Sequence, residues 1–403
     1  MTRDNKTALA DVCESVRYGY TASASHEEVG PRFLRITDIV PDSIDWDSVP
    51  FCEIDDADRD RFSLQSGDIV VARTGATVGY AKLIRDQVDA VFASYLVRFR
   101  VDSTIADPSF VGRLVESLVY KEFVKSRVGG AAQPNANAQV LGSFKFRLPT
   151  RREQERISSI LSAYDELIEN NRRRMALLEE TARQLYREWF VRLRFPGHEH
   201  TRITHGVPEG WERRRIGDIA DCVGGGTPAT SVSAYWEDAD VTWVTPTDVT
   251  RNQHYVLLDS EKKITEAGLQ NSSAKLVPPH AVLMTSRASV GFFAVAQREV
   301  CTNQGFISVV PTEEALSPYL LFHLSDRVEE IRSMGSGSTY PEVSRGKFRE
   351  FEVLLPEMKL VSLFAEQAEM LLKQIRVLKQ QNQRLRAGRD LLLPRLMSGE
   401  IAV

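Results

Sequence analysis

Residues 153–190 read EQERISSILSAYDELIENNRRRMALLEETARQLYREWF, and this stretch decides the fold of the chain. Its apolar residues recur in steps of four and three, which is the heptad spacing of a helix that packs against a second helix. No proline or glycine interrupts the run, so we predict a helix over residues 152–190, roughly 58 Å long at 1.5 Å per residue. The predicted seam comprises Ile157, Leu161, Tyr164, Ile168, Asn171, Met175, Leu178, Ala182, Leu185 and Trp189. A helix of this length needs a partner helix.

The sequence repeats itself at an offset of about 210 residues, which identifies that partner. Residues 74–79 (TGATVG) correspond to 286–291 (SRASVG), and residues 144–149 (FKFRLP) correspond to 351–356 (FEVLLP). The seam recurs at Phe364, Ala368, Leu371, Ile375, Leu378, Asn382, Leu385, Arg389, Leu392 and Leu396. The partner is therefore predicted to be residues 358–393 of the same chain.

Each repeat is predicted to be a strand-rich globule followed by its long helix. Runs of β-branched residues between turn residues predict strands at 68–72, 90–92, 96–101, 281–284 and 306–310, and shorter helices are expected at 108–128 and 318–333. Pro394 is expected to end the second long helix. The predicted fold class is α+β, with two strand-rich α/β domains that are related by the repeat and are joined and separated by two long antiparallel coiled-coil helices. The predicted boundaries are 1–150 and 211–356 for the two domains, 151–195 for the central helix, 196–210 for a linker, and 357–403 for the C-terminal helix and tail.

The register of the two helices can be predicted from the ends of their seams. A pseudo-twofold arrangement makes the helices antiparallel and places Ile157 beside Leu396 and Trp189 beside Phe364, so that Asn171 lies opposite Asn382. A buried Asn pair at one layer lowers stability but fixes the alignment of the helices. Arg389 and Asn382 are expected to weaken the second seam towards the C-terminus.

Composition limits the classes of protein that this chain can belong to. The net charge is −4, which is not the strongly basic balance of a protein that binds nucleic acid alone. No run of eighteen apolar residues and no secretory leader is present, so we expect a cytoplasmic protein with no membrane partner. The four cysteines form no CxxC pair, which argues against a zinc site and a disulfide framework.

Several short motifs suggest chemistry, but a simpler interpretation is favoured for each. Residues 107–110 and 317–320 resemble a methyltransferase box without its second proline, and both are better explained as helix starts. The glycines of 224–228 are followed by no Lys-Ser/Thr pair, so a phosphate loop is not supported. The histidines at 198, 200 and 205 have metal-like spacing without further ligands, and the acidic residues of 42–60 lack the lysine of a nuclease motif.

Polar loops at matching places in both repeats are better candidates for binding. The loop after the predicted strand 68–72 and the loop near residue 135 correspond to loops near residues 286 and 338. Arg, Asn and Gln side chains can each make two hydrogen bonds to a base edge, and Ser and Thr suit phosphates. The candidate DNA-binding residues are Arg73, Thr74, Thr77, Gln133, Asn135, Asn137, Thr285, Ser286, Arg287, Ser336, Ser338 and Thr339.

The chain resembles the specificity subunits of type I restriction-modification systems over nearly its full length. The resemblance lies in the combination of segments 148–161 (LPTRREQERISSIL), 207–220 (VPEGWERRRIGDIA), 224–230 (GGGTPAT) with 242–249 (TWVTPTDV), and 381–401 (QNQRLRAGRDLLLPRLMSGEI). The paired TGATVG and SRASVG segments belong to the same combination.

The resemblance implies a non-catalytic subunit whose two target recognition domains each read one half of a split DNA sequence. It also implies that the helices set the spacer and dock two modification (methyltransferase) subunits, which bind S-adenosylmethionine, and that restriction subunits join the complex. This chain itself is expected to bind no cofactor and no metal. Two alternatives remain open: a self-contained adenine methyltransferase, which requires S-adenosylmethionine binding by the isolated chain, and a coiled-coil adaptor that binds only proteins.

Overall fold

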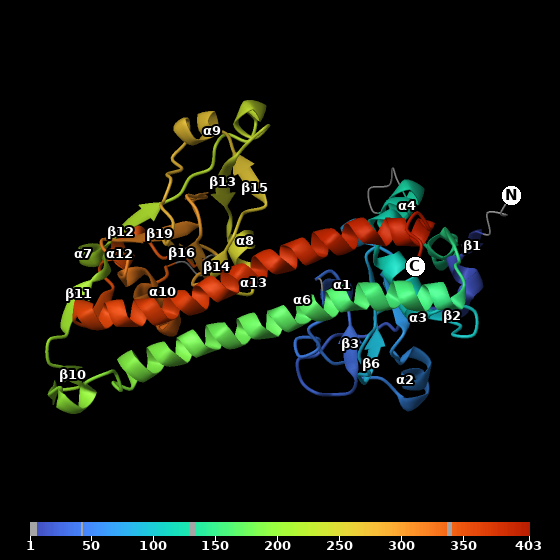
Figure 1. Ribbon diagram of the computed structural model, residues 1–403, viewed down its shortest axis with the longest axis horizontal. Helices are drawn as coiled ribbons and strands as arrows, with labels where there is room; N and C mark the ends of the chain where they lie inside the picture. Colours follow the sequence, from blue (N-terminus) through green and yellow to red (C-terminus); the bar gives the residue numbers. More distant parts are fainter. Residues whose placement is uncertain (1–5, 42, 129–133, 337–340) are drawn as a thin grey trace. The chain divides into compact units, whose positions relative to one another are not determined.

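The computed structural model describes residues 6–41, 43–128, 134–336 and 341–403. The chain divides into two compact units: unit 1 comprises Met1–Ile168 and Arg384–Val403, and unit 2 comprises Glu169–Gln383. Figure 1 labels the elements, with helix α6 (Arg151–Tyr186) in green and helix α13 (Met358–Ser398) in red. Each long helix contributes residues to both units.

Unit 1 is built around a four-stranded antiparallel sheet of order β2-β7-β4-β5. Strands β3 and β6 pair in parallel, and β1 pairs with β8 in antiparallel orientation. The strands are β1 Lys6–Ala8, β2 Cys13–Tyr18, β3 Arg32–Leu34, β4 Asp68–Ala72, β5 Ala81–Leu83, β6 Ala90–Phe92, β7 Leu96–Val101 and β8 Lys145–Arg147. The short helices are η1 Leu9–Val12, α1 Ile36–Ile39, α2 Asp56–Phe62, η2 Gly75–Thr77, α3 Pro108–Glu116, α4 Leu118–Val128 and α5 Ala138–Gly142.

Unit 2 contains a five-stranded sheet of order β12-β19-β16-β17-β14 and a three-stranded sheet of order β15-β13-β18. The strands are β9 Ile203–Thr204, β10 Val207–Pro208, β11 Glu212–Arg215, β12 Ala220–Gly224, β13 Val241–Val244, β14 Val256–Leu257, β15 Lys262–Ile264, β16 Val282–Thr285, β17 Phe293–Ala296, β18 Cys301–Thr302, β19 Phe306–Pro311 and β20 Glu352–Leu355. The shorter helices are η3 Arg187–Val191, η4 His198–His200, α7 Ile216–Ile219, η5 Ser233–Tyr235, α8 Pro246–Thr250, α9 Glu266–Gln270, α10 Leu316–Asp326, α11 Val328–Ser333 and α12 Arg345–Arg349.

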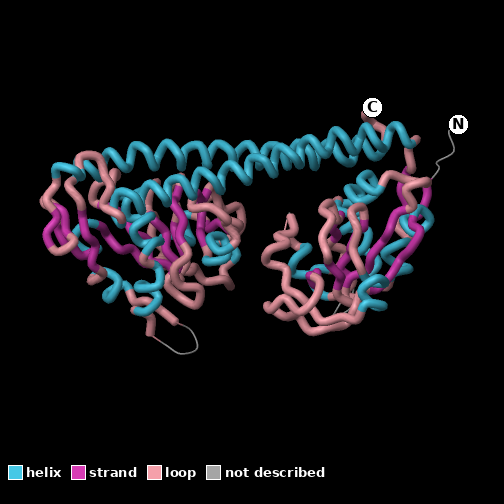
Figure 2. The backbone as a smooth tube through the Cα atoms, turned by 90° about the horizontal axis from the view of Figure 1, so that it is seen from below, coloured by secondary structure: helices cyan, strands magenta, loops and turns pink. Residues whose placement is uncertain are grey.

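The two units share a topology, which confirms the internal repeat found in the sequence. The strand order β2-β7-β4-β5 in unit 1 is matched by β12-β19-β16-β17 in unit 2. The parallel pair β3 and β6 corresponds to β13 and β18, and the antiparallel pair β1 and β8 corresponds to β11 and β20. Figure 2 shows the strands of each unit beside helices of the same unit. The predicted α+β fold with two strand-rich repeats is therefore confirmed.

Helix boundaries differ from the sequence prediction in three places. Pro394 does not end the second helix: α13 continues to Ser398, because the buried Leu396 and Met397 fasten its last turn into the core of unit 1. The helices expected at 108–128 and 318–333 are each divided in two, into α3 and α4 and into α10 and α11. Ser317 is no helix cap, since α10 begins one residue earlier and the Ser317 hydroxyl donates to His280 O. Asp107 does cap α3, as predicted, by accepting a hydrogen bond from Ser109 N.

The predicted helix register is confirmed in unit 2. In unit 2, Asn171 Nδ2 donates to Asn382 Oδ1 over 2.8 Å, and the rings of Trp189 and Phe364 lie 6.0 Å apart. In unit 1, Ile157 and Leu396 belong to one buried cluster. The seam residues are buried or half-buried: Ile157, Leu161, Tyr164, Ile168, Asn171, Met175, Leu178, Leu185, Trp189, Phe364, Leu371, Ile375, Leu378, Asn382, Leu385 and Leu392.

The Asn171–Asn382 pair is expected to specify register at a cost in stability. Replacing Asn171 alone with leucine leaves the buried Asn382 amide without this partner, so the free energy of unfolding should fall by about 1–3 kcal/mol. Replacing both residues with leucine should restore or exceed the original stability, because an apolar layer replaces a polar one. A double-mutant cycle by urea denaturation measures both effects. Equal and additive losses in the two single variants would show that the pair contributes nothing.

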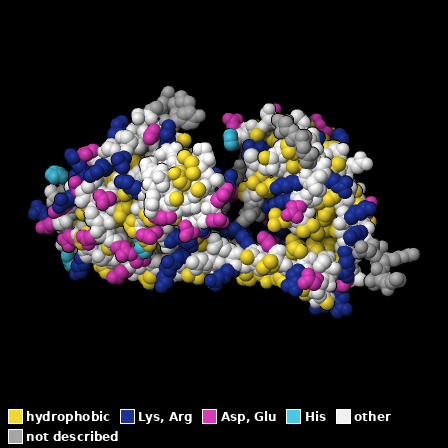
Figure 3. All heavy atoms as spheres, turned by 90° about the horizontal axis from the view of Figure 1, so that it is seen from above, with side chains coloured by type: hydrophobic (Ala, Val, Ile, Leu, Met, Phe, Trp, Pro, Cys, Tyr) yellow, Lys and Arg dark blue, Asp and Glu magenta, His cyan; other side chains and the backbone are white. Residues whose placement is uncertain are grey.

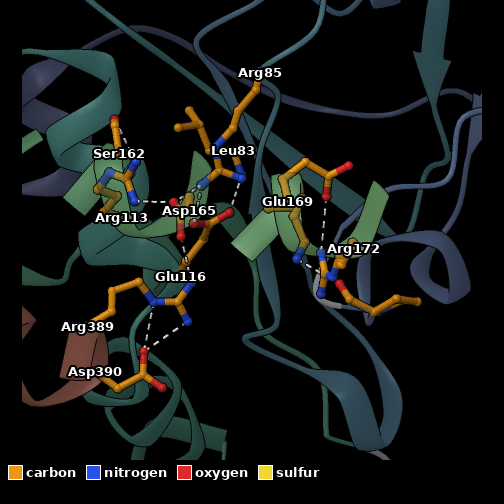
Figure 4. Close-up of polar contacts among 12 residues, drawn as sticks. Leu83, Arg85, Arg113, Glu116, Ser162, Asp165, Glu169, Arg172, Arg389 and Asp390 are labelled. Atoms are coloured by element: carbon orange, nitrogen blue, oxygen red, sulfur yellow. Dashed lines mark hydrogen bonds and ion pairs between the residues drawn. The ribbon is translucent and has the colours of Figure 1, made fainter. Parts of the chain in front are cut away.

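A cluster of charged side chains holds the long helices to the sheet of unit 1 (Figure 4). Asp165 on α6 accepts hydrogen bonds from Arg113 on α3 over 2.5 Å and from Arg389 on α13 over 2.8 Å, and Arg85 lies 3.5 Å from it. Glu116 accepts from Arg85 and from the backbone N–H of Leu83 in β5. The sequence suggested that Arg389 weakens the seam, but in the structure its guanidinium has a charged partner, Asp165, in the same unit. We call Asp165, Arg85, Arg113 and Arg389 the Asp165 cluster.

A buried histidine joins α6 to α10 in unit 2. Tyr186 lies 2.8 Å from Nδ1 of His323, and Arg327 donates to Nε2 over 3.2 Å. Burial, together with the positive charge of Arg327, lowers the pKa of His323 to about 3. The imidazole is therefore neutral near pH 7 and carries its proton on Nδ1, because Nε2 accepts.

Candidate functional site

Two loops that the sequence marks as binding candidates lie side by side in unit 1. Strand β4 ends at Ala72, and Gly75 and Gly79 adopt positive φ values of 73° and 83° in the turn that follows. The backbone N–H of Ala136 donates to Arg73 O over 2.8 Å, and Gly75 N donates to Pro134 O over 2.9 Å. The loop after β4 is thereby fixed against the segment that leads into α5.

The Arg73 side chain is positioned by an aromatic ring and an amide. Its guanidinium lies 4.8 Å from the centre of the Tyr18 ring, and Nη2 donates to Asn135 Oδ1 over 3.3 Å. The Tyr18 hydroxyl in turn accepts from Ala138 N, and Arg73 N donates to Tyr95 O. Because Asn135 Oδ1 accepts from Arg73, its exposed amide group is oriented to donate.

The corresponding loops of unit 2 are joined by two similar backbone hydrogen bonds, which lie one residue further along the loop after β16. Val343 N donates to Ser286 O over 2.9 Å, and Ala288 N donates to Pro341 O over 3.0 Å. Inside the turn, the Thr285 hydroxyl accepts from Phe292 N over 2.9 Å and also contacts Ser289 O. The pairing of these two loops therefore occurs in both units.

The sequence matches the family described as Type I restriction modification DNA specificity domain over residues 5–180 and 208–386. The chain belongs to this family. Its function is that of a DNA specificity subunit in a type I restriction-modification system.

Named relatives agree with the family match. The specificity subunit of type I restriction enzyme HindI from Haemophilus influenzae is 21% identical, over 84% of this chain and 87% of that protein. The MjaIX specificity subunit from Methanocaldococcus jannaschii is 34% identical over 152 residues, which are 37% of this chain and 35% of that protein. The crystal structure of the S subunit from M. genitalium has a TM-score of 0.55 at 14% identity, covers 98% of this chain and 97% of that chain, and supports the fold.

The candidate residues of this specificity subunit lie in two different environments. Asn135, Asn137, Arg287 and Ser336 are exposed, and Arg73, Thr74 and Thr77 are half-buried. Thr285 and Ser286 are buried, so in this conformation they hold the loop and present no side chain to a ligand. Gln133, Ser338 and Thr339 lie outside the described residues. Contact of any of these side chains with DNA stays a prediction.

Two residues of the specificity subunit that organise the loops were not identified from the sequence. Tyr18 stacks on Arg73 from the end of β2, and Glu342 lies 3.7 Å from Arg287 and pairs through its backbone with Ser336. Neither residue belongs to a recognisable motif. Glu342 directly follows a candidate loop. Its charge, opposite to that of Arg287, was the one signal in the sequence that could have pointed to it.

The surface charge of the specificity subunit is mixed. Figure 3 shows Lys and Arg side chains interspersed with Asp and Glu over the face that it draws. Among the described residues, no group of three or more His, Cys, Asp or Glu side chains could hold a metal ion. Within the same part of the chain, no helix is long and apolar enough to cross a membrane.

Proposed function

We propose that this specificity subunit reads a bipartite double-stranded DNA sequence, with one half-site read by the paired loops of each unit. The observation that carries the proposal is the repeated loop pairing, in which two similar backbone hydrogen bonds in each unit hold the residues near Arg73 and Arg287. Two similar reading surfaces in one chain suit a target with two halves.

The chemistry of the exposed loop residues suits base edges. Asn135 can donate through its amide, and a guanidinium such as that of Arg287 can donate two parallel hydrogen bonds to guanine O6 and N7. The Arg287 guanidinium already lies near Glu342, which limits the directions in which it can point. Different residues at the two surfaces support two different half-sites.

We propose that the long helices dock two modification (methyltransferase) subunits through their outer faces. Leu363, Met370 and Val377 on α13 are 40%, 54% and 42% exposed and follow one another at heptad spacing outside the seam. An exposed apolar stripe of this kind fits a further helix. The modification subunits would bind S-adenosylmethionine and carry out adenine methylation, and restriction subunits would join this complex.

We propose that the chain itself catalyses no reaction and works in the cytoplasm, where its DNA substrate is found. Its sequence has no complete methyltransferase box and no Walker loop, which supports a division of labour with the partner subunits.

The decisive experiment is to map adenine methylation across the genome of cells that express this chain with its modification subunit. A bipartite methylated motif that disappears on deletion of the chain is the expected result. Asn135→Ala should change the motif in one half only, and Arg287→Ala should change it in the other half. Absence of a bipartite motif would reject the proposal. Binding of S-adenosylmethionine to the isolated chain would favour a self-contained methyltransferase instead, and assembly without sequence-dependent DNA contact would favour a protein adaptor.

Lengthening both helices by one heptad is expected to lengthen the DNA spacer without changing the bases that are read. Seven residues inserted after Ile168 and seven after Gln383 preserve the seam and add about 10 Å of helix, which corresponds to about three base pairs. Methylation mapping gives the new spacer directly. An unchanged spacer in a variant that still assembles and methylates would remove the idea that the helices measure DNA.

A further inference from the structure

A polar hollow in unit 2 is not explained by the paired loops. It is lined by Leu258, Asp259, Gln297, Arg298, Arg376, Gln380 and Gln383, and it encloses about 180 Å³. All of these residues belong to unit 2. We call it the α13 hollow.

The fold brings these side chains together from two directions. Strands β14 and β17 run parallel, with Leu257 opposite Ala296, so the residues that follow them meet at one edge of the sheet. Arg376, Gln380 and Gln383 are spaced by four and three residues along α13 and therefore share one helix face. Lys379 fastens this part of α13 to the sheet by donating to Val256 O over 2.6 Å and by contacting Asn252.

The hollow has the chemistry of an anion site. Arg376 is half-buried, and within the described part of the chain its guanidinium forms no hydrogen bond or ion pair. Arg298 lies 4.0 Å from Asp259, a carboxylate that also lies 3.5 Å from Lys263. Two arginines and three glutamines thus line the hollow together with one aspartate and the buried Leu258.

The charge of the surrounding helix favours a polyanion over a single acidic side chain. Residues 370–383, the last part of α13 in unit 2, contain Lys373, Arg376 and Lys379 and no Asp or Glu. A long run of one sign attracts an extended chain of phosphates, and each phosphate that is neutralised releases counterions from DNA.

We propose that the α13 hollow binds a backbone phosphate of the DNA, with Arg376 and Arg298 as the charged contacts and the glutamine amides as further donors. The contact deepens the proposed function and rests on it, because it adds a sequence-independent contact to the base readout of the paired loops. It also gives α13 a direct part in holding DNA, besides its packing against α6.

The test measures how the affinity of the assembled complex with its modification subunits for duplex DNA depends on salt. Arg376→Gln and Arg298→Gln should each lower the slope of log affinity against log salt by about 0.9. Raising the salt from 50 to 200 mM lowers the affinity of the wild type by some factor. For each variant this factor should be about 3.5 times smaller. The methylated motif should not change, and Arg376→Lys should keep most of the slope.

Arg213→Gln is the matched control, because Arg213 is an exposed arginine of unit 2 on strand β11, at 67% exposure. Its slope should equal that of the wild type. Unchanged slopes in both hollow variants would overturn the proposal. Weaker assembly with the modification subunits at an unchanged slope would overturn it in favour of an acidic protein partner. Binding of inorganic phosphate to the chain at an unchanged DNA slope would overturn it in favour of a free anion.

The same measurement on a duplex that lacks the methylated motif separates this proposal from the proposed function. A phosphate contact does not depend on sequence, so the slope difference should persist on that duplex. If the wild type shows no preference for any motif, the proposed function fails, while the slopes of the two variants still decide whether the hollow binds DNA.

Discussion

Replacing Asp165 with alanine is expected to lower the free energy of unfolding of unit 1 by about 3 kcal/mol. Arg113 is 6% exposed, and its Nε has no hydrogen-bond partner among the described residues, so the Asp165 carboxylate is its main compensation. Without the carboxylate, the buried guanidinium of Arg113 has no negative charge to compensate it. The positive charges of Arg85, Arg113 and Arg389 then repel one another. Hydrogen exchange of amides in β4 and β7 reports the stability of unit 1 separately from that of unit 2.

Asp390→Asn is the matched control for this variant. Asp390 also contacts Arg389, but its side chain is 55% exposed, so the change should cost less than about 0.5 kcal/mol. If both substitutions lowered the free energy of unfolding equally, burial would not be the reason that Asp165 stabilises unit 1.

The contribution of Asp165 should also depend on pH. Burial raises the pKa of Asp165, but the positive charge of Arg113 and the hydrogen bonds from Arg389 and Arg113 outweigh burial and hold the pKa below its ordinary value. A carboxyl whose folded pKa is depressed stabilises fully above the unfolded value, about 3.9, and less as pH falls through the folded value. The stability difference between wild type and Asp165→Ala should therefore be constant from about pH 5 to 8 and shrink below about pH 4. A difference that grows on acidification would contradict this assignment.

Leu396→Ala is expected to destabilise unit 1 by about 2–5 kcal/mol, the usual cost of truncating a fully buried leucine. Leu396 is 3% exposed and lies in the same buried cluster as Ile157 and Leu161. Leu391, five residues earlier on the same helix, is 71% exposed, so Leu391→Ala should change stability by less than about 0.5 kcal/mol.

Urea denaturation measures the loss of stability in each leucine variant, and amide hydrogen exchange shows in which unit the loss occurs. In Leu396→Ala, protection should fall in the sheet of unit 1 and persist in β16 and β19 of unit 2. A uniform loss across both units would mean that the chain unfolds as one cooperative body. Little loss in Leu396→Ala would mean that the last turns of α13 are not part of the core.

The heptad pattern and the repeat were sufficient to predict the architecture. A period that is sustained over 39 residues leaves few alternatives to a paired helix, and a polar residue at one layer of each seam predicted the contact of Asn171 with Asn382. Runs of β-branched residues between turn residues then located the strands β4, β7, β16 and β19.

Contacts between residues far apart in the sequence were out of reach. The sequence near Pro394 does not show that Leu396 packs against residues that come some 250 positions earlier in the chain. The prediction therefore ended the helix at the proline. Arg73 contacts Tyr18, and Lys379 contacts β14, each through one isolated pair of residues. Such a pair leaves no periodic pattern in the sequence from which it could be predicted. The α13 hollow likewise forms only when two parallel strand ends meet a helix face.

The place of Leu396 and Met397 in the core of unit 1 has a consequence for synthesis on the ribosome. Unit 2 is one continuous segment, Glu169–Gln383, whereas unit 1 combines Met1–Ile168 with Arg384–Val403. The half that is translated first therefore cannot close its core until Arg384–Val403 has been synthesised, and until then its apolar surface stays uncovered. We expect unit 2 to acquire its native fold first, so that the order of folding is the reverse of the order of translation and the nascent N-terminal half is the part most dependent on chaperones.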